Sequence, residues 1–231
     1  MGKETSSKIF NLAKRASEET ATYTRWDAFN FSDSQNGIKE SFGQLIYFTD
    51  ESLSPQESIT YTAEQDRIAI LLPLTGGLIY SDASFAEAPV KSEQSRIIAV
   101  KKGETYTLTN PFENDWVNYL HIGFEEKAIS ELSSPVVQDL EFKQLNELVC
   151  FNNKMEDQPG YIGIYEGRSD GNYTLKDPNN GVFVYIITGA FEVQGRLLEY
   201  RDGLSLWNTD EIEFEALSNN AIILILETKL K

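Results

Sequence analysis

The sequence has almost none of the side chains that usually bind transition metals. Its 231 residues include one histidine, His121, and one cysteine, Cys150. Catalytic iron, manganese, nickel or copper normally needs three or four protein ligands, often several imidazoles with a carboxylate. A single imidazole argues against that chemistry. The lone cysteine allows no internal disulfide, and we interpret it as a small buried hydrophobe rather than a reactive thiol.

The sequence also lacks a long apolar run and an excess of basic residues. Its longest uninterrupted apolar stretch, residues 221–226, is far shorter than the about 20 residues that cross a bilayer, and the first five residues show no apolar signal region. Acidic residues outnumber basic ones by 36 to 20, which gives a formal charge of -16. Such a charge repels phosphate backbones and anionic lipids. We therefore expect a cytoplasmic protein that binds neither nucleic acid nor membranes directly.

Alternation of apolar and polar residues is the main pattern that is present. Ile212, Phe214 and Ala216 alternate with glutamates, and the apolar run 221–226 follows after a polar turn, which predicts a hairpin. The pairs Gln194-Gly195 and Asp202-Gly203 predict two more turns, in which Gly195 and Gly203 take a positive φ. Short strands at this spacing are typical of antiparallel sandwiches and barrels.

The first half repeats this pattern. Strands are expected over residues 68–74, 97–100, 105–108 and 117–124, with breaks at Gly76-Gly77 and Asn110-Pro111. Residues 125–153 carry mixed charge and include a helix-compatible stretch, residues 142–149. A second short helix is expected over residues 8–19.

Two segments of the second half carry a resemblance to a known family. Residues 189–195, followed by Asp202-Gly203-Leu204-Ser205-Leu206-Trp207, resemble the C-terminal cupin of pirin-like bicupins. In the first half, Phe29-Asn30-Phe31 resembles the Phe-x-Phe entry of the same family, and Phe42-Gly43, followed by Asp50, Leu53 and Pro55, resembles the strand and loop that lead to its metal site. Gly76, Tyr80 and Asp82 fall on the family's Gly, His and Asp.

The resemblance implies an all-β protein, a double-stranded β-helix (jelly-roll) bicupin with tandem barrels over about residues 42–124 and 160–227. The corresponding domains are residues 1–125 for the N-terminal segment and first cupin, 126–155 for a connector, and 156–231 for the second cupin.

The resemblance also places the family's metal site on this sequence. Its three histidines and one glutamate fall on Thr62, Glu64, Tyr106 and Leu108, so none of the four ligands is kept. We expect no metal and no cofactor. Instead, Thr62, Glu64 and Tyr106 should line a pocket that Leu108 makes drier, with Tyr80 and His121 as further candidates for its lining.

Two classes of function follow. The first is a non-catalytic module that binds a small molecule or a protein partner; the resemblance to pirin implies a regulatory partner among cytoplasmic enzymes or transcription factors. The second is an enzyme. It is either a pirin- or quercetinase-like dioxygenase with a metal site rebuilt around Glu64, or a metal-free isomerase with His121 as the base and Tyr106 as the acid.

Overall fold

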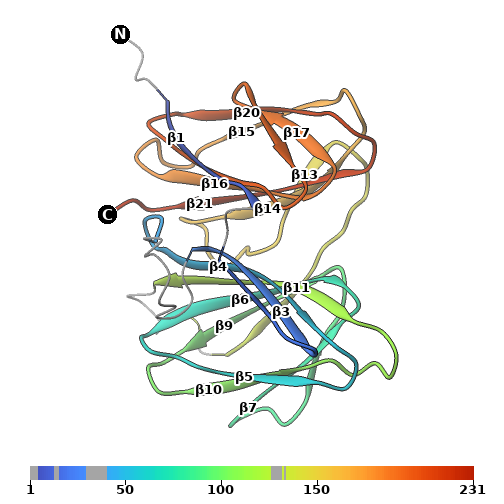
Figure 1. Cartoon of the computed structure of the whole chain (residues 1–231). Helices are drawn as coiled ribbons and strands as arrows, with labels where there is room; N and C mark the ends of the chain where they lie inside the picture. Colours follow the sequence, from blue (N-terminus) through green and yellow to red (C-terminus); the bar gives the residue numbers. More distant parts are fainter. Residues whose placement is uncertain (1–4, 13–15, 30–40, 126–131, 133) are drawn as a thin grey trace. The chain divides into compact units, whose positions relative to one another are not determined.

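The computed structural model describes residues 5–12, 16–29, 41–125, 132 and 134–231, and these residues form 21 β-strands and no α-helix (Figure 1). The all-β prediction is therefore confirmed. Within this described part, no helix could cross a membrane. The chain divides into two compact units, Ala16–Asp139 and Leu140–Lys231 together with Met1–Arg15.

The unit Ala16–Asp139 contains two antiparallel sheets. The larger has the order β12-β9-β6-β11-β4-β3-β2 and the smaller the order β5-β10-β7-β8. Their strands are β2 (Ala16–Glu19), β3 (Tyr23–Phe29), β4 (Leu45–Leu53), β5 (Ser58–Thr62), β6 (Arg67–Thr75), β7 (Leu78–Asp82), β8 (Ala88–Val90), β9 (Gln94–Val100), β10 (Thr105–Thr109), β11 (Val117–Glu125) and β12 (Val136–Asp139).

The core of this unit lies between its two sheets. Side chains of alternate residues on a strand point to opposite faces, so every second residue enters the core. On β11 these include Val117 and Tyr119, on β10 Tyr106 and Leu108, and they pack in one cluster with side chains of β5, β6, β7 and β9.

The other unit repeats the design. Its sheets have the orders β1-β19-β16-β21-β14-β13 and β15-β20-β17-β18. Their strands are β1 (Ser6–Phe10), β13 (Glu147–Cys150), β14 (Gly160–Tyr165), β15 (Asp170–Thr174), β16 (Gly181–Thr188), β17 (Ala190–Val193), β18 (Arg196–Glu199), β19 (Gly203–Trp207), β20 (Glu211–Ala216) and β21 (Ala221–Thr228). Ile212, Phe214 and Ala216, predicted from alternation, lie in its core.

Both expected helices are wrong. The segment expected as a helix over residues 8–19 contributes the strands β1 and β2, and the stretch 142–149 enters the strand β13. Strand β1 pairs with β19, which is distant in sequence, whereas β2 pairs with the next strand, β3, and β13 with the next strand, β14. Tertiary pairing overrides weak local preference in such polar segments.

The strand pairing also shows to which unit the N-terminal segment and the expected connector belong. Strand β1, placed by the sequence with the first cupin, pairs with β19 of the other unit. The expected connector over 126–155 supplies β12, which pairs with β9, and β13, which pairs with β14.

The two predicted glycine turns have different outcomes. Gly195 has a φ of 70° and follows Gln194 at 49°, as a two-residue hairpin between β17 and β18 requires. For Gly203 the prediction is wrong, because the positive φ belongs to Arg201, at 64°. Gly203 is instead a close-packed strand residue: a Cβ there would lie 2.8 Å from the ring of Phe183.

Candidate functional site

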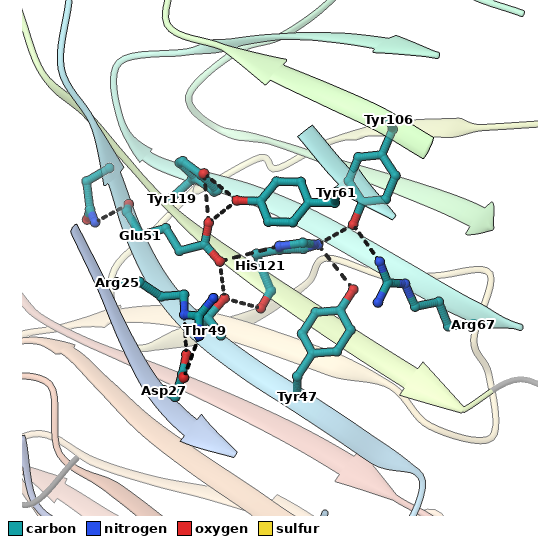
Figure 2. A network of polar contacts seen from close by, with 11 residues as sticks. Arg25, Asp27, Tyr47, Thr49, Glu51, Tyr61, Arg67, Tyr106, Tyr119 and His121 are labelled. Carbon is teal, nitrogen blue, oxygen red and sulfur yellow. Dashed lines mark hydrogen bonds and ion pairs between the residues drawn. The ribbon is translucent and has the colours of Figure 1, made fainter. Parts of the chain in front are cut away.

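A network of polar side chains fills the interior of the unit Ala16–Asp139 (Figure 2). Its centre is His121 on β11, which lies opposite Thr49 of β4, while Glu51 of β4 lies opposite Tyr119 of β11. Residues directly and diagonally opposite across two strands share one face of the sheet. The pairing of β4 with β11 therefore brings the only imidazole of the chain close to a buried carboxylate.

Each ring nitrogen of His121 faces a polar group. Nε2 lies 2.6 Å from the phenolic oxygen of Tyr106 and 3.1 Å from that of Tyr47. Nδ1 lies 3.5 Å from Oε1 of Glu51. Burial lowers the pKa of His121 below 6.5, although Glu51 acts in the opposite direction. The imidazole is therefore neutral at neutral pH, and we assign its proton to Nδ1, facing Glu51, so that Nε2 accepts from Tyr106.

Glu51 is fully buried and accepts hydrogen bonds from three hydroxyls. Thr49 donates to Oε1 at 2.6 Å, Tyr119 donates to Oε2 at 2.8 Å, and Tyr61 also donates to Oε2. Burial by itself would raise the pKa of Glu51. The hydrogen bonds and the imidazole of His121 outweigh it and lower that pKa to about 2. Glu51 is thus a buried carboxylate that stays ionised.

Arg67 on β6 closes the network on the opposite side of Tyr106. Its Nη2 lies 3.4 Å from the phenolic oxygen of Tyr106, and its guanidinium lies over the rings of Tyr47 and Tyr106, at 5.2 and 5.9 Å. Burial raises the pKa of Tyr106 well above 10, so this phenol remains protonated. A cation and an anion are therefore joined inside the unit through Tyr106 and His121.

The structure brings together some of the predicted site residues and separates others. Tyr106 and His121 are in direct contact, Tyr80 stacks on Tyr106 at 6.0 Å between ring centroids, and Leu108 is buried in the same core. Thr62 and Glu64 are exposed. They do not line the interior with Tyr106.

The reason is a one-residue error in the expected register. On this segment Tyr61 and Ala63 are the core residues, and Thr62 and Glu64 face away from them. A shift of one residue moves every side chain of a strand to the other face. The alternation of polar and apolar residues over 59–64 predicts the observed register, with the odd-numbered residues facing inward. Nothing comparable marks Glu51 or Tyr47 in the sequence.

The inward-facing residues do not fit a catalytic transition metal. Ala63 and Leu108 carry no donor atom, and burial raises the pKa of Tyr61 and Tyr106, which keeps both phenols protonated. Within the described ranges, no three His, Cys, Asp or Glu side chains lie together as a metal site would require.

A pocket of about 770 Å³ lies beside the network, where β7 and β9 end and β10 begins. Its lining includes Tyr80, Phe85, Lys101, Glu104 and Tyr106. Tyr106 thus belongs both to the wall of the pocket and to the buried network. A concave site of this size, with three aromatic rings and a few charged groups, suits a small organic ligand.

The comparisons with known proteins agree with this architecture. Residues 159–227 match the quercetinase C-terminal cupin domain family. No curated protein matches the chain in sequence. Among solved structures, the bacterial pirin YhhW of Escherichia coli in complex with nickel(II) superposes with a TM-score of 0.82 at 15% identity, over 98% of this chain and 100% of that one.

A second solved structure is a quercetin 2,3-dioxygenase from Acinetobacter baumannii. It superposes with a TM-score of 0.73 at 13% identity, over 97% of this chain and 79% of that one. Together with the domain match, these similarities confirm the resemblance found in the sequence. The chain has the two-cupin fold of these proteins, and its second unit matches the C-terminal cupin domain of quercetinases.

Proposed function

We propose that the first cupin works without a transition metal and that this protein binds a small molecule, without catalysis, in the pocket beside Tyr80 and Tyr106. The observation that carries the proposal is the filled interior. Glu51, Tyr61, Tyr106, Tyr119 and His121 are all at most 4% exposed, and they bond to one another. A ligand can reach the outer edge of this cluster, whereas its centre is closed.

The enzyme alternatives have weaker support. A rebuilt metal site around Glu64 would need ligands that face Glu64, but its side chain is exposed on the side away from Tyr106. The metal-free isomerase is favoured by one observation, the 2.6 Å contact between Tyr106 and His121. Both groups point at each other inside the network, however, and Tyr106 is 1% exposed. A protein partner in the cytoplasm stays the alternative prediction.

Elemental analysis tests the metal-independent part of the proposal. Protein purified without a metal-affinity tag, and then loaded with ferrous iron, manganese, nickel or copper and desalted, should contain far less than one equivalent of each. Near-stoichiometric metal would contradict the proposal: its loss in Glu64→Gln would support the dioxygenase alternative rebuilt around Glu64, and its loss in Glu51→Gln would place the metal in the buried network. Glu213→Gln, at an exposed position of the other unit, is the matched control.

Fragment binding tests the pocket. We expect small aromatic fragments such as phenol, indole, benzoate and benzamide to shift NMR signals of residues around Tyr80 and Tyr106. Thr105→Trp, at an exposed position in the lining, should block those shifts without changing the melting temperature. Thr60→Trp, exposed on the adjacent strand and outside the lining, should leave them intact. Shifts that persist in Thr105→Trp would place binding elsewhere.

A further inference from the structure

Arg96 is a buried cation that the network described above does not use. It lies in the middle of β9, opposite Leu71 of β6 and Val137 of β12, and is only 4% exposed. Its Nε is fully covered without a hydrogen-bond partner, and its guanidinium makes no hydrogen bond or ion pair with any residue in the described ranges. Burying a guanidinium in this way is unfavourable unless something else compensates its charge.

The other buried or half-buried arginines of this unit, Arg25 and Arg67, have polar partners for their guanidinium groups. Arg25 is paired with Asp27 at 2.8 Å, and Arg67 bonds to the hydroxyl of Tyr106. Among the described residues, Arg96 has two ring faces beside it and Asp82 as a nearby charge that forms no ion pair with it. Its guanidinium carbon lies 4.3 Å from the ring centroid of Tyr80 and 5.6 Å from that of Phe85. Ring contacts offset part of the charge but do not satisfy the N–H donors.

Asp82, two residues after Tyr80, already accepts hydrogen bonds from other groups. Asp82 accepts the hydroxyl of Tyr80 at 2.5 Å and the backbone N–H groups of Ser84 and Phe85 at 2.7 and 2.8 Å. Asp82 therefore fixes the loop that carries Phe85, and it makes no ion pair with Arg96 in the described structure. Among the described residues, none accepts a hydrogen bond from Arg96, which lies beside that loop.

Tyr80 and Phe85 connect Arg96 to the pocket. Both line the pocket, and both contact the guanidinium. Phe85 is 39% exposed, and it lines the pocket while Arg96 does not, so a ligand in the pocket would have to displace this ring to reach Arg96. A ligand that displaces this ring meets an aromatic wall first and a cation behind it.

We infer that Arg96 anchors the carboxylate of a small aromatic monocarboxylate whose ring packs against Tyr80 and Phe85. The inference rests on the proposed ligand pocket and specifies what it binds. A guanidinium matches a carboxylate with two parallel hydrogen bonds, which would use its unpartnered donors. Lys101 places a positive charge in the lining itself, whereas Glu104 and Asp82 disfavour ligands with several negative charges. This balance of charges favours a ligand that carries a single carboxylate.

The test compares three probes of similar shape: benzoate, benzamide and benzylamine, titrated by calorimetry or NMR into wild type, Arg96→Met and Arg96→Lys. We expect wild type to bind benzoate at least tenfold more tightly than the other two. Arg96→Met should lose this preference, and Arg96→Lys should keep part of it, because lysine retains the charge without the forked donors. Arg168→Met, at an exposed arginine of the other unit, is the control.

A second readout separates a ligand anchor from a structural residue. Without ligand, Arg96→Met should melt at the same temperature as wild type or higher, because it removes a buried cation that has no hydrogen-bond partner among the described residues. Benzoate should raise the melting temperature of wild type and of Arg168→Met fully, that of Arg96→Lys less, and that of Arg96→Met not at all. A large drop for ligand-free Arg96→Met and for Arg96→Lys would identify Arg96 as structural and overturn the inference.

The remaining outcomes distinguish this inference from the proposed pocket. Equal binding of benzoate and benzamide, or benzoate binding that survives Arg96→Met, overturns the role of Arg96 and leaves the pocket in place. The same holds if neutral fragments bind and benzoate does not. Failure of every fragment to respond to Thr105→Trp overturns the pocket itself.

Discussion

Nε2 of His121 lies 2.6 Å from the phenolic oxygen of Tyr106, and this contact joins β11 of the seven-stranded sheet to β10 of the four-stranded sheet. The two sheets of the first cupin are thus connected by a hydrogen bond at the centre of their core. A buried polar network of this kind stabilises one arrangement of side chains when its members are all satisfied. The protonation of His121 and Glu51 is therefore part of the stability of this unit.

The protonation state of His121 can be read directly, because it is the only histidine. Burial lowers the pKa of His121 below 6.5, so its titration midpoint by ¹⁵N NMR should lie below that value. The signals should show the tautomer protonated at Nδ1. Since Glu51 raises the pKa of His121, Glu51→Gln should move the midpoint lower still. A midpoint above 6.5 would contradict the assignment of a neutral, buried imidazole.

The carboxylate of Glu51 should make stability depend on acid pH. The pKa of Glu51 falls from 4.5 to about 2 on folding, so its contribution is complete above about pH 4.5 and is lost as the pH falls toward 2. We expect Glu51→Gln to lower the free energy of unfolding at pH 7 by about 1.5–3 kcal/mol, the range for hydrogen bonds to a charged group. The gap should close between pH 4.5 and 2 in urea titrations.

The control for this experiment is Glu213→Gln, at an exposed glutamate of β20. Its unfolding free energy should follow that of wild type at every pH. His121, with its lowered pKa, also makes the protein less stable as the pH falls; this loss is the same in wild type and Glu213→Gln and is larger in Glu51→Gln, where the pKa of His121 is lower still. A gap between wild type and Glu51→Gln that is unchanged at pH 2.5 would show that the charge of Glu51 is not what matters.

Two neighbouring hydroxyls test the register of β5. Tyr61→Phe removes a buried donor to Glu51 that also contacts the hydroxyl of Tyr119, and it should cost about 1–3 kcal/mol. Thr62→Val removes a hydroxyl from an exposed position and should change stability by less than about 0.5 kcal/mol. Equilibrium urea unfolding measures both. The reverse order would restore the register in which Thr62 faces the interior.

Substitutions at two glycines of the second cupin should lower its stability for different reasons. Gly195→Val should cost about 1–2 kcal/mol, because a φ of 70° is unfavourable for a β-branched residue although nothing lies within 4 Å of the added Cβ. Gly195→Asn should be tolerated, since asparagine adopts this conformation more readily. Gly203→Ala should cost about 1–3 kcal/mol through overpacking against Phe183. Thermal unfolding of the three variants separates strain from overpacking.

Much of the fold could be predicted from local pattern. The alternation at Ile212, Phe214 and Ala216 identifies β20, and Gln194-Gly195 identifies the turn between β17 and β18, because each depends on residues close in sequence. The segment of β1 has no such signal. Its partner β19 is almost two hundred residues away, so local polarity favoured a helix that tertiary pairing replaced.

The site was harder to predict for a related reason. Tyr106 and His121 were candidates, and the structure joins them, but Glu51 resembles a solvent-exposed acid in the sequence. Its burial depends on hydroxyls from Thr49, Tyr61 and Tyr119, which come from three strands and meet only after folding. Thr62 and Glu64 were placed by family spacing, and a single residue of shift reversed their direction.

The pairing of β1 with β19 means that the second cupin is not one continuous piece of polypeptide. A fragment beginning at Leu140 would leave β19, which is Gly203–Trp207, with a free row of backbone donors and acceptors along its outer edge. Such an edge invites pairing between molecules, so the excised domain should aggregate unless Ser6–Phe10 is supplied as a separate peptide or joined by a linker. During synthesis, Ser6–Phe10 cannot pair with β19 until Gly203–Trp207 has been made and has left the ribosome.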